Sequence, residues 1–154
     1  MQLYLIRHAH ALDGDDDEAR PLSGKGRAQV RRVASFLRTS GVFTPEEIWH
    51  SPLVRARQTA ELLARRLKLD APLCAVADLT PADDPRRMVR RLAREKRTIA
   101  LVGHDPHLST LASLLVAGTA TPPVFALKKC SVLALERVAG RWVVRWHVSP
   151  ELLA

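Results

Sequence analysis

Residues 2–8 read QLYLIRH, an almost unbroken apolar run that ends in Arg7 and His8. A run of this kind is typical of a strand that is buried on both faces of a parallel sheet. Two further strand-like runs occur at 47–50 and 98–102, and each leads directly into polar residues. The sequence therefore predicts neighbouring parallel strands whose ends carry functional side chains.

The residues at these strand ends have a common chemistry. Arg7 and His8 follow the first strand, Ser51 and Arg55 follow the second, and His104 follows the third. Ligands of parallel sheets bind beyond the carboxyl ends of the strands, where loops lead into helices. Guanidinium groups and helix N-termini attract phosphate oxygens, and an imidazole can attack phosphorus. We therefore expect a crevice that binds a phosphoryl group, with Ser51 as a further substrate contact.

The remaining segments alternate between helix and strand patterns. Apolar residues recur at helical spacing in four segments: 23–40, 52–67, 85–94 and 106–118. Pro52 follows Ser51 as proline follows an N-cap residue, and the pairs Asp84–Pro85 and Asp105–Pro106 open the last two segments in the same way. A strand is expected at 73–76, and a hairpin at 131–137 and 142–148 around Ala139–Gly140. The pattern predicts an α/β fold, a three-layer α/β/α sandwich with a mostly parallel sheet and an antiparallel C-terminal hairpin.

Length and composition are those of one globular domain over residues 1–154. No apolar stretch approaches the roughly 18–20 residues that a membrane span needs, and residues 1–6 lack the features of a secretory signal. We therefore expect a cytoplasmic protein without membrane contact. Cys74 and Cys130 are expected to be buried thiols, and the acidic segment 13–18 lacks the glycine and glutamate of a calcium loop. No metal or other cofactor is predicted.

The chain carries a net charge of +8, which raises the question of nucleic-acid binding. The densest basic cluster falls on one predicted helix and comprises Arg86, Arg87, Arg90, Arg91 and Arg94. No aromatic residue is interleaved with this cluster, so a base-stacking platform is absent from the pattern. We interpret the cluster as a solvated helix face and expect no nucleic-acid partner.

Four other histidines are assigned structural roles. A single histidine after a strand is usually a hydrogen-bonded structural residue, and this interpretation applies to His10, His50 and His147. His107 lies one helical turn beyond His104, and we expect it at the surface or at a helix cap. No arrangement of Cys, Asp or Glu completes a metal site around them.

Three motifs resemble those of the histidine phosphatase superfamily, which has the phosphoglycerate mutase-like fold. LIRH at 5–8 is similar to its Arg-His-Gly signature, SPLVRARQTA at 51–60 to its second motif, and VGH at 102–104 to its third. The strings RPLSGKG at 20–26 and DLTP at 78–81 resemble the small SixA-type phosphohistidine phosphatases in particular.

The resemblance implies a phosphoryl transfer in two steps. His8 would attack phosphorus and form a phosphohistidine intermediate, which water would then hydrolyse to release inorganic phosphate. Three side chains would contact the phosphoryl oxygens: Arg7, Arg55 and His104. Arg20 would reach the same phosphate or its protein carrier, and no metal would be needed because the basic residues supply the charge.

Two departures from the superfamily pattern bear on the substrate. Ala9 stands where glycine is usual, which adds a Cβ where the backbone would pass close to the phosphate. The acidic proton donor of many members is missing in an obvious form; Asp78 is a candidate, whereas Asp105 is expected to cap a helix. An alkoxide leaving group needs a proton donor, but the imidazole of phosphohistidine, with a conjugate-acid pKa of about 7, leaves without one.

The leading hypothesis is therefore a phosphohistidine phosphatase that acts on a phosphoprotein, such as the phosphorelay domain of a signal-transduction protein. The alternative is a phosphatase of small phosphate esters from the same superfamily. A mutase is disfavoured because no capping insertion could retain a product. The non-enzymatic alternative is a basic binding module for RNA or acidic proteins, which would bind with a steep salt dependence.

Overall fold

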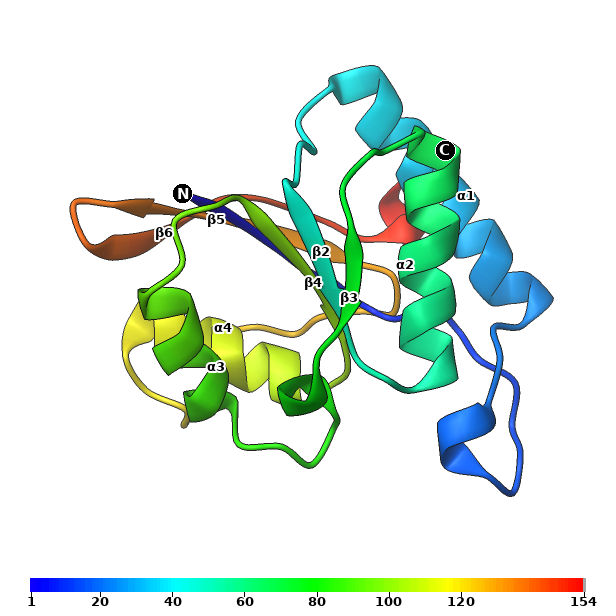
Figure 1. Cartoon of the computed structure of the whole chain (residues 1–154), viewed down its shortest axis with the longest axis horizontal. Coiled ribbons are helices and arrows are strands. Elements are labelled where there is room, and N and C mark those ends of the chain that lie inside the picture. Colours follow the sequence, from blue (N-terminus) through cyan, green and yellow to red (C-terminus); the bar gives the residue numbers. More distant parts are fainter. Residues whose placement is uncertain (154) are drawn as a thin grey trace.

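The sheet has six strands in the order β3-β2-β4-β1-β5-β6. The computed structural model describes residues 1–153. Its strands are β1 (Gln2–Arg7), β2 (Glu47–His50), β3 (Leu73–Ala75), β4 (Ile99–Gly103), β5 (Val132–Val138) and β6 (Arg141–Val148). Its α-helices are α1 (Gly24–Ser40), α2 (Val54–Leu67), α3 (Pro85–Ala93) and α4 (His107–Ala117). Figure 1 shows α1 and α2 on one face of the sheet, and α3 and α4 on the other.

Strand direction agrees with the prediction. β3, β2, β4 and β1 pair in parallel, whereas β5 and β6 are antiparallel additions at the edge beside β1. In the β1–β4 pair, Arg7 lies opposite Gly103, and in the β2–β4 pair, His50 lies opposite Val102. This register brings the three polar strand ends to one edge of the sheet.

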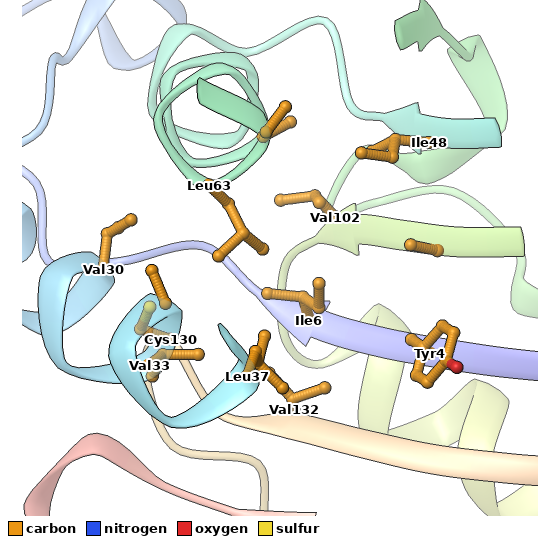
Figure 2. Close-up of a cluster of buried hydrophobic side chains, with 14 of the residues drawn as sticks. Tyr4, Ile6, Val30, Val33, Leu37, Ile48, Leu63, Val102, Cys130 and Val132 are labelled. Carbon is orange, nitrogen blue, oxygen red and sulfur yellow. The ribbon is translucent and has the colours of Figure 1, made fainter. Parts of the chain in front are cut away.

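Each face of the sheet packs against its own helix pair. Along β1, Tyr4 and Ile6 belong to the core under α1 and α2, whereas Leu3 and Leu5 belong to the core under α3 and α4. This alternation is the period of two expected of a strand that is covered on both faces. Figure 2 shows the first core, in which Leu37 of α1 and other helix side chains meet strand residues including Tyr4 and Ile6. The predicted three-layer α/β/α sandwich is confirmed.

Local signals fix several element ends. Ser23 caps α1 by accepting a hydrogen bond from the backbone N–H of Gly26, and Asp84 accepts one from Arg86 at the start of α3. Gly41 ends α1 in the left-handed conformation. The hairpin turns at Ala139–Gly140, where both residues have positive φ, as a two-residue turn of type I′ requires.

Two predicted features of the helix starts differ from the structure. α2 begins at Val54 rather than at Pro52, and no side chain caps it. Ser51 instead accepts a hydrogen bond from the backbone N–H of Leu53 in the turn before the helix. His107, expected at the surface or at a helix cap, is the first residue of α4 and is only 1% exposed.

The two cysteines also differ from each other. Cys130 is buried in the core as expected, whereas Cys74 is only partly buried. Its thiol donates a hydrogen bond to the carboxylate of Glu47, so its surroundings are polar on one side. Within residues 1–153, no helix has the length and apolar character needed to cross a membrane.

The start of α1 holds the segment that follows His8. The backbone N–H of Ser23 donates to the carbonyl of His10, and the imidazole Nδ1 of His10 lies 2.6 Å from the Ser23 hydroxyl. Gly26 lies so close to this segment that an added Cβ would stand 2.0 Å from the carbonyl oxygen of His10. Only a residue without a side chain allows this contact.

We expect Gly26→Ala to destabilise the fold by at least about 2 kcal/mol, because backbone atoms must move to relieve the overlap. Gly24→Ala is the matched control, since its Cβ would have no neighbour within 4 Å. That variant should be neutral or up to about 1 kcal/mol more stable, because alanine favours the helix. Urea unfolding of both variants gives the measurement. Equal free energies of unfolding for Gly26→Ala and Gly24→Ala would contradict the packing described for α1.

Candidate active site

His8 follows the last residue of β1 and its side chain is buried. Its backbone N–H donates to the carbonyl of Gly103 at 2.9 Å, which ties it to the end of β4. The ring Nδ1 lies 2.7 Å from the carbonyl oxygen of Ala9. A carbonyl only accepts, so Nδ1 carries the proton and Nε2 keeps its lone pair. The ring is held in the tautomer that a nucleophile needs.

The environment keeps this imidazole neutral. Burial lowers the pKa of His8 to about 4, and the positive charges of Arg55, Arg7 and Lys129 act in the same direction. The hydrogen bond to Ala9 opposes this shift only in part. At neutral pH the ring is therefore uncharged, with Nε2 able to form a bond.

His104 lies directly across from His8, with 5.0 Å between the ring centroids. Burial lowers its pKa to about 3, and the nearby charges of His8 and Arg55 add to the effect. Its Nε2 lies 2.8 Å from the hydroxyl of Ser51. That oxygen also accepts from the backbone N–H of Leu53, and the Ser51 hydroxyl can donate to Nε2 in the tautomer that carries the His104 proton on Nδ1.

Ser51 is fully buried and its hydroxyl is occupied by these two contacts. This placement differs from the prediction that Ser51 contacts substrate directly. The side chain orients His104 instead, because the turn at 51–53 points the hydroxyl toward the neighbouring strand end.

The two predicted arginines both have an unpaired inner nitrogen. Arg7 donates from Nη1 to the carbonyl of Leu127, and Arg55 donates from Nη1 to the backbone carbonyl of Asp17. The Nε groups of Arg7 and Arg55 and the Nδ1 of His104 are buried and have no hydrogen-bond partner among residues 1–153. Buried donors without a partner are uncommon in folded proteins. Three of them around one pair of imidazoles suit the binding of an anion.

Asp17 is a residue at this site that the sequence analysis missed. Its carboxylate lies 3.3 Å from Nη2 of Arg55 and 3.0 Å from Nη1 of Arg20. The hydrogen bond from Arg20, and then the charge of Arg55, lower the pKa of Asp17. The sequence analysis excluded segment 13–18 as a calcium loop, and nothing in its composition distinguishes Asp17 from its acidic neighbours.

Arg20 joins the cluster through this shared carboxylate. It donates from Nε to the carbonyl of Leu12 and from Nη1 to Asp17. No described contact joins it to His8 or His104. Its guanidinium therefore lies beside Arg55 at the rim of the crevice.

Lys129 is a second residue that was missed. Its charge is among those that lower the pKa of His8, and its own pKa is lowered by burial and by Arg7. The next residue, Cys130, donates its backbone N–H to the carbonyl of Arg7. A signal for Lys129 did exist. An antiparallel strand starts at the edge where its parallel neighbours end, so basic residues just before β5 fall beside the crevice.

The two candidate acids point elsewhere. Asp78 pairs with Arg87 of α3 at 3.6 Å, and no described contact joins it to His8. Asp105 accepts hydrogen bonds from the backbone N–H and the hydroxyl of Ser109, which is the helix-capping role expected for it. Its carboxylate also lies 3.9 Å from Nη1 of Arg7.

Ala9 does not intrude on the crevice. Its side chain is fully buried in the core under α1 and α2, and its backbone N–H donates to the hydroxyl of Thr59 at 3.0 Å. The expected interference of its Cβ with a bound phosphate is therefore absent from the geometry, because the methyl group points into the core.

The positive charge of the crevice comes from side chains of three arginines and a lysine: Arg7, Arg20, Arg55 and Lys129. Within residues 1–153, no three His, Cys, Asp or Glu side chains are grouped so that they could hold a metal ion. An anion with several oxygens fits this set of donors.

Comparison with known proteins agrees with this chemistry. Residues 3–79 match the model of the histidine phosphatase superfamily (branch 1). The chain is 30% identical to the phosphohistidine phosphatase SixA of Escherichia coli (strain K12), over 97% of this chain and 94% of the relative. It is 35% identical to an uncharacterised protein of Picosynechococcus sp. (strain ATCC 27264 / PCC 7002 / PR-6), over 99% of this chain and 93% of that protein.

A solved structure is similar over the whole chain. The protein histidine phosphatase SixA complexed with tungstate superposes with a TM-score of 0.86 at 28% identity, covering 99% of both chains.

We expect both imidazoles to remain neutral far below the usual histidine range. ¹⁵N-detected NMR should show the Nδ1–H tautomer for His8 down to about pH 5, with protonation centred near pH 4. The unfolded chain protonates its histidines near pH 6.5. Above that pH, burial of the two neutral rings therefore does not reduce the free energy of unfolding. The free energy of unfolding should fall as the pH drops from 6.5 toward 4, because the unfolded chain then binds protons that the folded chain does not. Titration of either ring near pH 6.5 would contradict the burial described.

Proposed function

The chain belongs to the histidine phosphatase superfamily (branch 1), and from this membership we propose that it removes phosphate from a phosphohistidine residue of a protein. The observation that carries the proposal is the ring of His8, whose Nδ1 is held by the Ala9 carbonyl and which lies 5.0 Å from the ring of His104, within reach of the positive charges of Arg55 and Arg7. We further propose that residues 1–154 act as one domain, without a metal, on a cytoplasmic phosphorelay protein.

In the first step, Nε2 of His8 forms a bond to phosphorus while the bond from phosphorus to the leaving imidazole breaks. The leaving nitrogen takes the electron pair of that bond, and the ring departs as neutral imidazole because its other nitrogen carries a proton. The His8 ring becomes positively charged, and the hydrogen bond from Nδ1 to the Ala9 carbonyl, 2.7 Å long, stabilises this form. The ring needs no deprotonation beforehand because its pKa of about 4 leaves it neutral.

The charge on the phosphoryl oxygens is offset by the surrounding donors. Arg7 and Arg55 would donate from their Nε groups and His104 from Nδ1. Ser51 would act as a positioning residue by fixing the tautomer of His104. Donors that are placed before the reaction avoid the cost of reorganisation, and they account for most of the catalysis in phosphoryl transfer.

In the second step, water attacks the phosphorus of phosphorylated His8. The bond between phosphorus and Nε2 breaks, Nε2 recovers its lone pair, and inorganic phosphate leaves with the oxygen of the water. The same donors serve this step, because the phosphoryl oxygens remain between them.

No described contact joins a carboxylate to His8, which supports phosphohistidine as the substrate. The carboxylates beside the site, Asp17 and Asp105, lie against Arg55 and Arg7 instead. Asp78 is paired with Arg87, which does not support a role for it as proton donor. An imidazole leaving group departs without protonation, whereas an alkoxide does not. The similarity to SixA along the whole chain supports the same substrate class.

The proposal is tested by comparing a phosphohistidine protein with a panel of sugar phosphates. We expect the first to be hydrolysed and the second set to react slowly. His8→Ala should lower the rate at least about 10³-fold, because the nucleophile is lost. Rapid quench of the native enzyme should trap an acid-labile, base-stable phosphate that His8→Ala lacks.

Turnover of the sugar phosphates alone would favour the small-molecule alternative. Unchanged behaviour of His8→Ala, together with binding that depends steeply on salt, would favour a non-catalytic basic module.

Arg55→Lys should lower kcat/KM about 10- to 100-fold. Lysine retains the charge but loses the planar fork and the inner Nε donor. Arg57→Lys is the matched control, since Arg57 lies two residues away on the same helix, is half exposed and pairs with Glu61. The control should keep full activity. Equal activity of both variants would show that Arg55 does not bind the phosphoryl group.

A further inference from the structure

A pocket of about 750 Å³ lies beside the crevice, between the start of α4 and the segment that leads into β5. Its volume is in the range of about 300–1,000 Å³ that is usual for sites of small ligands. Its apolar walls are formed mainly by Pro106, Ala120, Pro123, Phe125, Ala126 and Leu127. Neither imidazole of the crevice lines it, so it is a separate compartment.

The pocket adjoins the phosphoryl site on two sides. Arg7 lines it and donates to the carbonyl of Leu127, another of its lining residues. Beyond Lys128, Cys130 donates its backbone N–H to the carbonyls of Arg7 and His8. On the other side, Asp105 and Pro106 line the pocket and directly follow His104. One wall thus continues the segment that carries His104, and the other is hydrogen-bonded to the segment that carries His8.

Three charged residues also line the pocket. Arg7 and Lys128 are cationic, and the carboxylate of Asp105 is held by Ser109 near Arg7. A ligand that places its phosphoryl group between the histidines would therefore extend past Arg7 into apolar surroundings. Such a ligand has an anionic end and an apolar part close to it.

We propose that this pocket binds an apolar side chain next to the phosphohistidine of the protein substrate. The inference rests on the proposed function, because it takes the phosphoryl group to be bound at His8. Transfer of that side chain from water to the apolar walls is favourable. Arg7 lines the pocket and lies between it and the phosphoryl site at His8. Substrate choice thus depends on sequence beside the phosphohistidine.

The test uses two phosphohistidine peptides that differ only in leucine or serine next to the phosphorylated residue, and free phosphohistidine as a reference. The native enzyme should hydrolyse the leucine peptide with a kcat/KM about tenfold higher. Ala126→Trp, which adds an indole ring at the pocket wall, should reduce this preference and leave turnover of free phosphohistidine unchanged. Ala120→Trp, on another part of the wall, should have the same effect. This second variant keeps the test valid if Ala126→Trp fails to fold.

Ala117→Trp is the matched control, because Ala117 is exposed on the last turn of α4 and does not line the pocket. This variant should keep the preference for leucine. Equal turnover of both peptides by the native enzyme, with free phosphohistidine still cleaved, would overturn the pocket assignment alone. Cleavage of 1-naphthyl phosphate with no cleavage of any phosphohistidine substrate would overturn the proposed function as well.

Discussion

The parallel pairing of β1 with β4 is the constraint on which the site depends. Arg7 lies opposite Gly103, and the backbone N–H of His8 donates to the Gly103 carbonyl at 2.9 Å. Two histidines 96 positions apart in the sequence thus come from adjacent strand ends, with their rings 5.0 Å apart. A shift of one residue in this register would turn each side chain of β1 to the opposite core, so the apolar alternation that stabilises the sheet also fixes the site.

The parts of the fold that follow from short-range patterns were predictable from sequence. The helical apolar spacing, the Asp84 cap and the Ala139–Gly140 turn each depend on neighbours within a few residues. The convergence of Arg7, His8, Arg55 and His104 also followed, because parallel strands bring their ends to one edge.

The parts that depend on long-range contacts were not predictable in the same way. Asp17 reaches Arg55 across 38 positions, and nothing within 13–18 singles it out. His107 looked like a surface residue because its burial depends on segments packed over the start of α4. The α2 start was misplaced because Ser51 can cap a helix or orient His104, and only the structure shows which contact its hydroxyl makes.

Asp17 compensates the buried positive charge of Arg55. The side chain of Arg55 is only 6% exposed, and a buried charge without a partner is costly. The exposed carboxylate and the backbone carbonyl of Asp17 supply that partner, and Arg20 holds the same carboxylate from outside. Each Nη group of Arg55 uses one of its two N–H donors on Asp17, and Nε has no partner among residues 1–153. An anion bound at Arg55 therefore shares the guanidinium with the carboxylate of Asp17, and the negative charge of Asp17 opposes its binding.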